Sequence, residues 1–220
     1  MKAMILAAGR GTRMRALTDT LPKPLLTVRD TPLLDRLIGQ LATAGFTDIV
    51  INVAYLGGKI REHLGTGAHL SVTIRYSDEG PAGLETGGGI RRALPLLGHE
   101  PFLVVNGDIY TDYDFSRLPA APAALAHLVL ADNPDHHPQG DFGLCDGRVT
   151  DSAPRLTFTG IGVYRATLFA EMTADRFPLA PLLRRAILQG LVTGEHHRGL
   201  WTDVGTPERL AALNAAGMDR

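Results

Sequence analysis

Two glycines and two basic residues lie close together near the start of the chain. The sequence LAAGRGTRM occupies residues 6–14, directly after a short apolar stretch, and a Pro-Lys-Pro sequence centred on Lys23 follows it. Gly9 and Gly11 allow the backbone to turn sharply and to bring its N–H groups close to an anion. Arg13 and Lys23 add positive charge on either side of that turn. This combination predicts a binding site for a polyphosphate, and therefore for a nucleotide.

Two common nucleotide-binding motifs do not account for this segment. The dinucleotide fingerprint requires a third glycine three positions after the second, where this chain has Met14. The P-loop requires Gly-Lys followed by Ser or Thr, whereas Gly58-Lys59 is followed by Ile60. An ordinary strand-to-helix turn is the alternative, and the basic residues beside the glycines make it the weaker interpretation.

Several segments, in order along the chain, are similar to the sequence signatures of the sugar-1-phosphate nucleotidylyltransferases. The matching segments are residues 6–14, 17–18, 22–25, 107–108, 158–161 and 201–207. Ala16 stands where many members of the family have proline, a difference that affects the stiffness of the loop more than its chemistry. Because the matches extend over nearly the whole chain, the resemblance implies the family's reaction. In it, a sugar 1-phosphate and a nucleoside triphosphate give a nucleoside-diphosphate sugar and pyrophosphate.

The implied reaction is attack by an oxygen of the sugar phosphate on the α-phosphorus of the triphosphate. That oxygen is already ionised near neutral pH, so we expect catalysis to consist of positioning and charge neutralisation. The planar guanidinium of Arg13 suits the β- and γ-phosphates, and the compact charge of Lys23 suits the α-phosphate and the incoming sugar phosphate. These two residues are the predicted catalytic residues, and the alternative is that each is a solvated surface cation.

Two aspartates are predicted to bind Mg²⁺, with Mn²⁺ as a possible substitute. Asp108 follows an apolar stretch typical of a buried strand, and Gly107 leaves room beside it for a phosphate. Mg²⁺ takes few carboxylates and completes its shell with phosphate oxygens and water. The pairing of Asp108 with Asp203 rests on the resemblance to the family's paired aspartates. The alternative is that Asp108 begins a turn and Asp203 caps a local element.

Two segments are expected to hold the nucleotide: the glycine turn, and residues 77–89, which place glycines at the start of a helix. Free N–H groups at a helix start suit polar or anionic partners, although a helix start without a role in binding is the alternative. Asp78 and Glu79 stand where many family members have a glutamine that contacts the base. The predicted nucleotide-binding residues are Ala8, Gly9, Gly11, Thr12, Gly83, Glu85, Thr86 and Asn106.

The sequence FTGI resembles the family's sugar-binding strand and implies sugar contacts at Thr159 and Gly160. Many relatives have a Glu-Lys pair shortly before this strand, but no lysine follows Lys59 in this chain. A sugar that carries a carboxylate needs a cation or several N–H donors, because leaving that group desolvated and unpaired is costly. Arg155 is the first candidate for this cation and Arg198 the second.

Within the family, the short chain and its motifs resemble members that use UTP and N-acetylmuramate α-1-phosphate in cell-wall recycling. Enzymes that act on glucose 1-phosphate or mannose 1-phosphate are alternatives, and so is a choline-phosphate cytidylyltransferase, which shares the first motif. A different class of protein would be a sensor that binds sugar nucleotides without turnover. The presence of Lys23, Asp108 and Asp203 favours the enzyme.

Strand and helix patterns alternate along the first half, which is typical of a mostly parallel sheet with helices on both faces. We therefore expect a Rossmann-like α/β fold with a small sugar-binding lobe. A single domain, residues 1–220, would comprise a nucleotide-binding half of about 1–115 and a sugar-binding half of about 116–220. Strands are predicted at 2–6, 48–53, 70–76, 102–105, 125–130 and 156–164. Helices are predicted after a Thr31 cap, at 57–64 and 85–97, and near 167–173, 180–189 and 207–216, the last after a Thr206 cap.

Composition narrows the partners. The 220 residues are 45% hydrophobic with a net charge of −1, so the sequence indicates neither a nucleic-acid-binding surface nor a polybasic membrane patch. Cys145 is the single cysteine, which excludes an internal disulfide and fits a reducing cytoplasm. We expect a cytoplasmic enzyme without a leader peptide, membrane span or fused hexapeptide-repeat domain. Its partners would be the nucleoside triphosphate and the sugar 1-phosphate.

Overall fold

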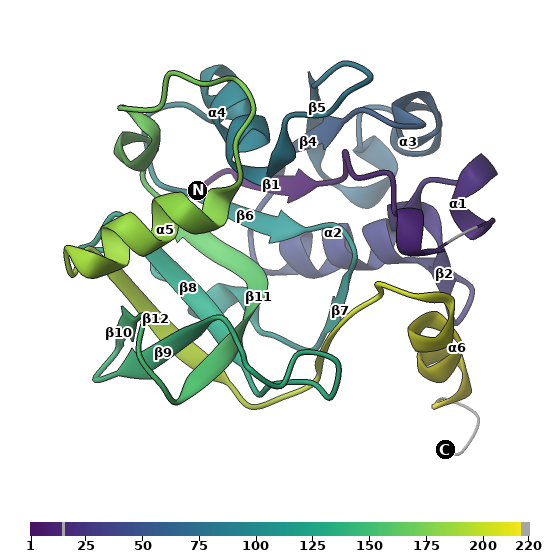
Figure 1. Cartoon of the computed structure of the whole chain (residues 1–220). Helices are drawn as coiled ribbons and strands as arrows, with labels where there is room; N and C mark the ends of the chain where they lie inside the picture. Colours follow the sequence, from purple (N-terminus) through teal and green to yellow (C-terminus); the bar gives the residue numbers. More distant parts are fainter. Residues whose placement is uncertain (15, 217–220) are drawn as a thin grey trace.

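The computed structural model describes residues 1–14 and 16–216. Within these residues, nine strands form one central sheet (Figure 1), in the order β5-β4-β1-β6-β11-β8-β12-β10-β9. The first half of the chain supplies β1 (Ala3–Leu6), β4 (Asp48–Val53), β5 (Thr73–Asp78) and β6 (Phe102–Asn106). The second half supplies β8 (Ala126–Ala131), β9 (Phe142–Cys145), β10 (Arg148–Thr150), β11 (Arg155–Tyr164) and β12 (Val192–His197).

The first half of the sheet is parallel. β1 lies between β4 and β6 and runs parallel to both, and β5 continues the parallel order beyond β4. Successive side chains of a strand face opposite sides, so Met4 and Ile5 belong to two different hydrophobic clusters. Because the carboxyl ends of these four strands meet at one edge, this edge is where an open α/β sheet binds its ligands.

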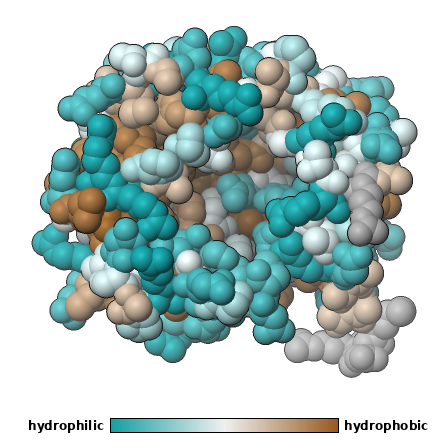
Figure 2. Space-filling view, in the orientation of Figure 1, coloured by the Kyte–Doolittle hydropathy of each residue, from teal (hydrophilic) through white to brown (hydrophobic). Residues whose placement is uncertain are grey.

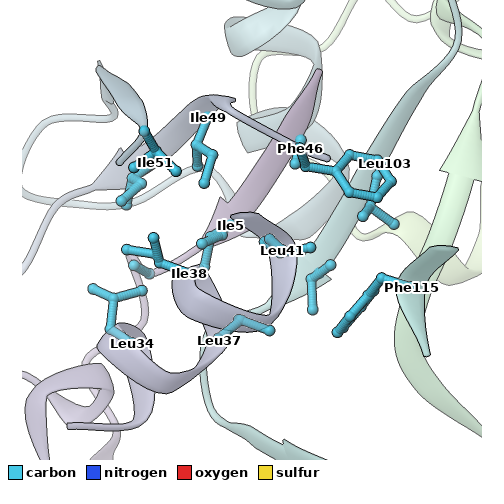
Figure 3. Packing of buried hydrophobic residues seen from close by; sticks show 14 of the residues in the cluster. Ile5, Leu34, Leu37, Ile38, Leu41, Phe46, Ile49, Ile51, Leu103 and Phe115 are labelled. Atoms are coloured by element: carbon cyan, nitrogen blue, oxygen red, sulfur yellow. The ribbon is translucent and has the colours of Figure 1, made fainter. Parts of the chain in front are cut away.

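Helices cover both faces of the sheet, which confirms the predicted fold class (Figure 1). Helices α2 (Leu33–Thr43) and α3 (Gly57–Leu64) pack on the face of Ile5, and α4 (Glu85–Leu97) and α5 (Leu179–Leu188) pack on the face of Met4. Figure 3 shows the apolar side of α2 directed toward the strands. The buried side chains that α2 contributes are Leu33, Leu34, Leu37, Ile38 and Leu41.

The start of α2 differs from the prediction. Thr31 was expected to cap the helix, but Thr31–Pro32 form the short strand β3, which pairs with β2 (Thr27–Val28). The helix therefore begins at Leu33 without a side-chain cap. Its end is as predicted, because Gly45 has a φ of 88° and takes the chain out of the helix.

The second half brings in antiparallel pairing. β11 is antiparallel to both β6 and β8, whereas β12 returns parallel to β8. Several short strands were not predicted from the sequence. Two of them, β7 (Ile109–Thr111) and β13 (Trp201–Asp203), pair with each other. These two strands come directly after Asp108 and directly before Val204, so they connect the two halves of the chain.

The remaining elements are short. Residues 68–70 form a 3-10 turn, and Ser71 after it has a φ of 59°, so β5 starts later than the predicted strand at 70–76. The helix expected near 167–173 is a 3-10 turn over Ala166–Phe169. The predicted Thr206 cap is confirmed, since its hydroxyl accepts from the N–H of Arg209 at the start of α6 (Pro207–Ala215). The other segments are α1 (Leu17–Thr20) and 3-10 turns at Thr12–Met14, Lys23–Leu25 and Phe115–Arg117.

No helix in the described part of the chain combines the length and the apolar character that crossing a membrane requires.

The packing of α2 on the sheet gives a test of the core. Leu34 is fully buried beneath the sheet, so Leu34→Ala is expected to lower the free energy of unfolding by about 2–5 kcal/mol. Leu188, at the end of α5, is 80% exposed, so Leu188→Ala is expected to change it by less than about 0.5 kcal/mol. Urea unfolding of the two variants measures both values, and similar losses would contradict the assigned packing of α2.

Candidate active site

A cleft of about 620 Å³ opens at the carboxyl ends of β1, β4 and β6, and Figure 2 shows the middle of this face as a hollow. Its walls come from the glycine turn after β1, from the ends of β4 and β6, and from the segment between β5 and α4. All of the predicted nucleotide-binding residues line it, as do Arg13, Lys23 and Asp108. Asp203, Arg155, Thr159 and Gly160 are not among the lining residues.

The glycine turn is held by its own packing. Gly11 has a φ of 67°, and its carbonyl accepts from the N–H of Met14 at 2.8 Å and from the Thr18 hydroxyl at 3.1 Å. Met14, which stands where a dinucleotide-binding turn has its third glycine, is fully buried with Val28 and Val204. The turn is therefore anchored in a small apolar cluster, and its residues 8–13 line the cleft.

Lys23 forms an ion pair with Asp108 at the wall of the cleft. The lysine is only 8% exposed, which excludes the solvated surface cation considered for it, whereas Arg13 is exposed at the rim. Gly107 allows the ends of β1 and β6 to approach each other, because a Cβ there would lie 2.7 Å from the carbonyl oxygen of Leu6. The geometry therefore places one buried cation and one carboxylate beside the glycine turn.

Asp203 lies on the strand next to Asp108. β13 pairs with β7 so that Asp203 is opposite Ile109, and the N–H of Val204 donates to the carbonyl of Asp108 at 2.8 Å. The Asp203 carboxylate forms an ion pair with Arg209 and lies 3.1 Å from Nε2 of His136. Tertiary pairing therefore brings Asp203 of β13 beside the turn that carries Asp108, and each carboxylate has a cationic partner.

The donor set fits a divalent ion that also uses ligands from the substrate. The described residues contain no group of three or more His, Cys, Asp or Glu side chains that would hold a metal alone. Two carboxylates, one in the turn after β6 and one on β13, would leave most coordination positions to phosphate oxygens and water, which is how Mg²⁺ is usually bound.

The predicted sugar-binding segment, residues 158–161 of β11, contacts residues that line or flank the cleft. A bulge in β11 places Gly160, with a φ of 79°, against the Asn106 side chain. Thr159 is fully buried, and its hydroxyl donates to the carbonyl of Val129 at 2.7 Å. Its own carbonyl accepts from Nε1 of Trp201 at 3.0 Å. The Thr159 hydroxyl is thus occupied by a hydrogen bond within the protein. The bond from Trp201 fixes β13, which contains Asp203, to β11.

The arginine candidates for the sugar lie apart from the cleft lining. Arg155 forms an ion pair with Asp151 at 3.2 Å, and Asp151 is shared with Arg184 of α5. Arg198 is exposed in the turn before β13. A role for either residue toward the sugar stays a prediction.

The glycine run at the start of α4 packs against protein. A Cβ at Gly87 would overlap the Phe177 ring, one at Gly88 would overlap the backbone of Asp175, and one at Gly89 would overlap the Glu79 carboxylate. These three glycines therefore make room for other parts of the chain.

Among the residues of the cleft wall, sequence reasoning missed Asn52, and it named Glu79 within the 77–89 segment without giving it a role. Asn52 interrupts the apolar pattern of β4 at its carboxyl end, and a polar residue in that position was the available signal. Both are buried, and Nδ2 of Asn52 donates to Oε1 of Glu79 at 2.6 Å. His136 and Arg209, the partners of Asp203, were also missed, because they come from a loop and a helix without a motif.

Comparisons with known proteins agree with this geometry. Residues 2–157 match the family described as nucleotidyl transferase. The chain is 51% identical, over 98% of its length and 97% of the relative's, to N-acetylmuramate alpha-1-phosphate uridylyltransferase of Neisseria meningitidis serogroup B. It is 36% identical, over 97% of its length and 95% of the relative's, to the protein of that name from Caulobacter vibrioides.

A third relative, the UTP–glucose-1-phosphate uridylyltransferase of Synechocystis, is 33% identical over 59% of this chain and 37% of its own length. A solved Bacillus anthracis protein, assigned as a glucose-1-phosphate thymidylyltransferase, superposes with a TM-score of 0.84 over 100% of this chain and 96% of that one. Its identity is 22%, so this likeness shows the fold. The chain belongs to the nucleotidyl transferase family, and it is a nucleotidyltransferase.

The Gly160 bulge gives a test of how β11 supports the cleft. Gly147→Ala is a matched control, because that glycine has a φ of 73° and a Cβ there meets nothing within 4 Å. The control is expected to cost about 1–2 kcal/mol for the left-handed backbone alone. Gly160→Ala is expected to cost about 1–3 kcal/mol more, because its Cβ must displace Asn106. Equal losses in urea unfolding would show that Asn106 and β11 are not tightly packed.

Proposed function

We propose that this protein transfers the uridylyl group of UTP to N-acetylmuramate α-1-phosphate, giving UDP-N-acetylmuramate and pyrophosphate. An oxygen of the sugar phosphate attacks the α-phosphorus of UTP, and the bond from that phosphorus to the bridging oxygen of the β-phosphate breaks. The observation that carries the proposal is the 51% identity to the Neisseria meningitidis relative over 98% of this chain. That match includes the second half of the chain, where the sugar is expected to bind.

The glucose-1-phosphate reaction is the second candidate. Its support is the Synechocystis relative, which aligns with only 59% of this chain. A mannose-1-phosphate guanylyltransferase aligns with a similar share, 53% of this chain, so a partial match informs little about the sugar. Full-length similarity favours the muramyl substrate.

The roles that we propose for the cleft residues follow from their charge and position. The turn at Gly9, Gly11 and Thr12 would receive the triphosphate through its N–H groups, and exposed Arg13 would hold the β- and γ-phosphates that leave as pyrophosphate. Buried Lys23 would neutralise charge at the α-phosphate during transfer. Ala8, Gly83, Glu85, Thr86 and Asn106 would enclose the nucleoside.

Nucleotidyltransferases of this family generally use a divalent metal, and we propose Mg²⁺ bound by Asp108 and Asp203. The ion would neutralise the phosphates and orient them for in-line displacement. In the chain itself, Lys23 and Arg209 compensate the two carboxylates and hold them in place.

On the sugar side, we propose that backbone groups near Thr159 and Gly160 contact the sugar. N-acetylmuramate has a carboxylate on its lactyl group, and Arg155, with Arg198 as the alternative, would be the cation that pairs with it. We place the reaction in the cytoplasm, because the single cysteine, Cys145, is a free thiol and fits a reducing compartment.

A substrate grid tests the proposed activity. Each of the four nucleoside triphosphates is combined with N-acetylmuramate α-1-phosphate, N-acetylglucosamine 1-phosphate, glucose 1-phosphate or mannose 1-phosphate, and pyrophosphate release is measured. UTP with the muramyl substrate is expected to have the highest kcat/KM. A preference for a sugar phosphate without the carboxylate would contradict the muramyl assignment, and release from none of the combinations would contradict the enzyme.

The metal ligands are tested by Asp108→Asn and Asp203→Asn. Each variant is expected to lose about a hundredfold or more in kcat at saturating Mg²⁺, because a carboxylate that neutralises the ion is lost. Glu100→Gln, an exposed carboxylate remote from the cleft lining, serves as the control. Normal turnover by a folded Asp108 or Asp203 variant would remove that residue from the metal site.

A further inference from the structure

Three separate segments meet in the wall of the cleft through one chain of hydrogen bonds. The N–H of Ala7 donates to Oδ1 of Asn52 at 2.7 Å, and Nδ2 of Asn52 donates to Oε1 of Glu79 at 2.6 Å. The other carboxylate oxygen of Glu79, Oε2, accepts from the N–H of Leu84 at 2.7 Å. The glycine turn, the end of β4 and the segment before α4 are therefore connected through two side chains.

The direction of these bonds leaves one arrangement. A backbone N–H donates only, so Ala7 requires the amide oxygen of Asn52, and the amide nitrogen must then face Glu79. An ionised carboxylate accepts only, and Glu79 uses one oxygen for Asn52 and the other for Leu84. Two amides, or two carboxylates, at positions 52 and 79 would leave at least one of these polar groups without a suitable partner.

The surroundings make this pair rigid. Asn52 is 3% exposed and Glu79 is 8% exposed, although both also border the cleft. Gly89 of α4 provides the space, because a Cβ there would overlap Glu79 and lie 3.1 Å from Nδ2 of Asn52. A buried polar group that loses its partner is costly, so the pair holds the segments it connects.

The segment that Glu79 holds has an unusual backbone. Gly83 and Glu85 both have a φ of 61°, and the N–H of Leu84 between them is the group bonded to Glu79. The predicted nucleotide contacts Gly83, Glu85 and Thr86 directly flank that bond. The bond from Leu84 to Glu79 connects this part of the wall to Asn52 of β4.

We propose that Asn52 and Glu79 act together as positioning residues that set the spacing between the two walls of the nucleoside pocket. The inference rests on the proposed function, because the pocket is assigned to UTP. Glu79 acts through Leu84 and Asn52 rather than by touching the base. A direct contact of the Glu79 carboxylate with the base is the competing explanation, and the experiment separates the two.

The test exchanges the acid and the amide between the two positions. In Glu79→Gln, an amide NH₂ must face either Asn52 Nδ2 or the Leu84 N–H, and in Asn52→Asp two carboxylates face each other. In the double variant N52D/E79Q every donor again has an acceptor. The N–H of Ala7 and the new amide NH₂ at position 79 both donate to the new carboxylate at position 52, and the N–H of Leu84 donates to the amide oxygen at position 79. It also retains the net charge of the wild type, and Glu62→Gln on the exposed side of α3 is the control.

Isothermal titration with UTP and steady-state kinetics give the readout. Each single variant is expected to bind UTP about tenfold more weakly, as one buried hydrogen bond is lost, with KM for the sugar phosphate unchanged. The double variant is expected to recover most of that affinity. Single variants that bind UTP normally would overturn the proposal, and so would a folded double variant that does not recover, because the carboxylate at residue 79 would then be needed by the base.

Two further measurements keep the outcomes distinct. Hydrogen exchange of the nucleotide-free protein is expected to be faster at Leu84 in Glu79→Gln and to return toward the wild-type rate in the double variant. Unchanged exchange in both variants would overturn the proposed role of Asn52 and Glu79. If the wild type prefers another nucleoside triphosphate, the titration is repeated with that nucleotide. The proposed UTP specificity then fails, while the swap still confirms or overturns the positioning pair.

Discussion

A lysine buried in the wall of a cleft must have a negative partner, and in this protein Asp108 supplies it. The two residues are far apart in sequence, so their pairing requires the glycine turn after β1 and the end of β6 to lie side by side. Removing one partner of such a pair leaves an uncompensated charge, which is much worse than removing both. The ion pair therefore helps to hold the glycine turn beside the end of β6.

Close approach of backbones is the second requirement of the cleft, and several glycines meet it by different means. Gly107 allows β6 to continue beside β1, where a side chain would meet the carbonyl of Leu6. Gly160 allows β11 to bulge beneath Asn106, and Gly89 leaves the space in which Asn52 and Glu79 meet. In each case the missing side chain leaves space for a polar group of the cleft wall next to a buried strand or helix.

The second half of the chain contributes mainly by holding the first. β11 extends the sheet antiparallel to β6, and its buried Thr159 carries the indole of Trp201. Trp201 starts β13, which pairs with β7 and so brings Asp203 next to the strand that follows Asp108. β11 runs away from the cleft edge, and α5 then leads into β12, which is parallel to β8 and therefore to β6. β12 ends at the edge where β6 ends, and the chain continues from there into β13.

Much of this protein was determined by local sequence alone. The glycine turn, the helices at 57–64 and 85–97, the strand at 48–53 and the Thr206 cap all follow from side-chain spacing and from residues that favour one backbone conformation. The short strands β7 and β13, the bulge at Gly160 and the Asn52–Glu79 pair do not. Thr31 also reads as a cap in isolation and becomes part of a strand when β2 lies beside it. These features are stabilised by partners distant in the chain, so only the tertiary structure decided them.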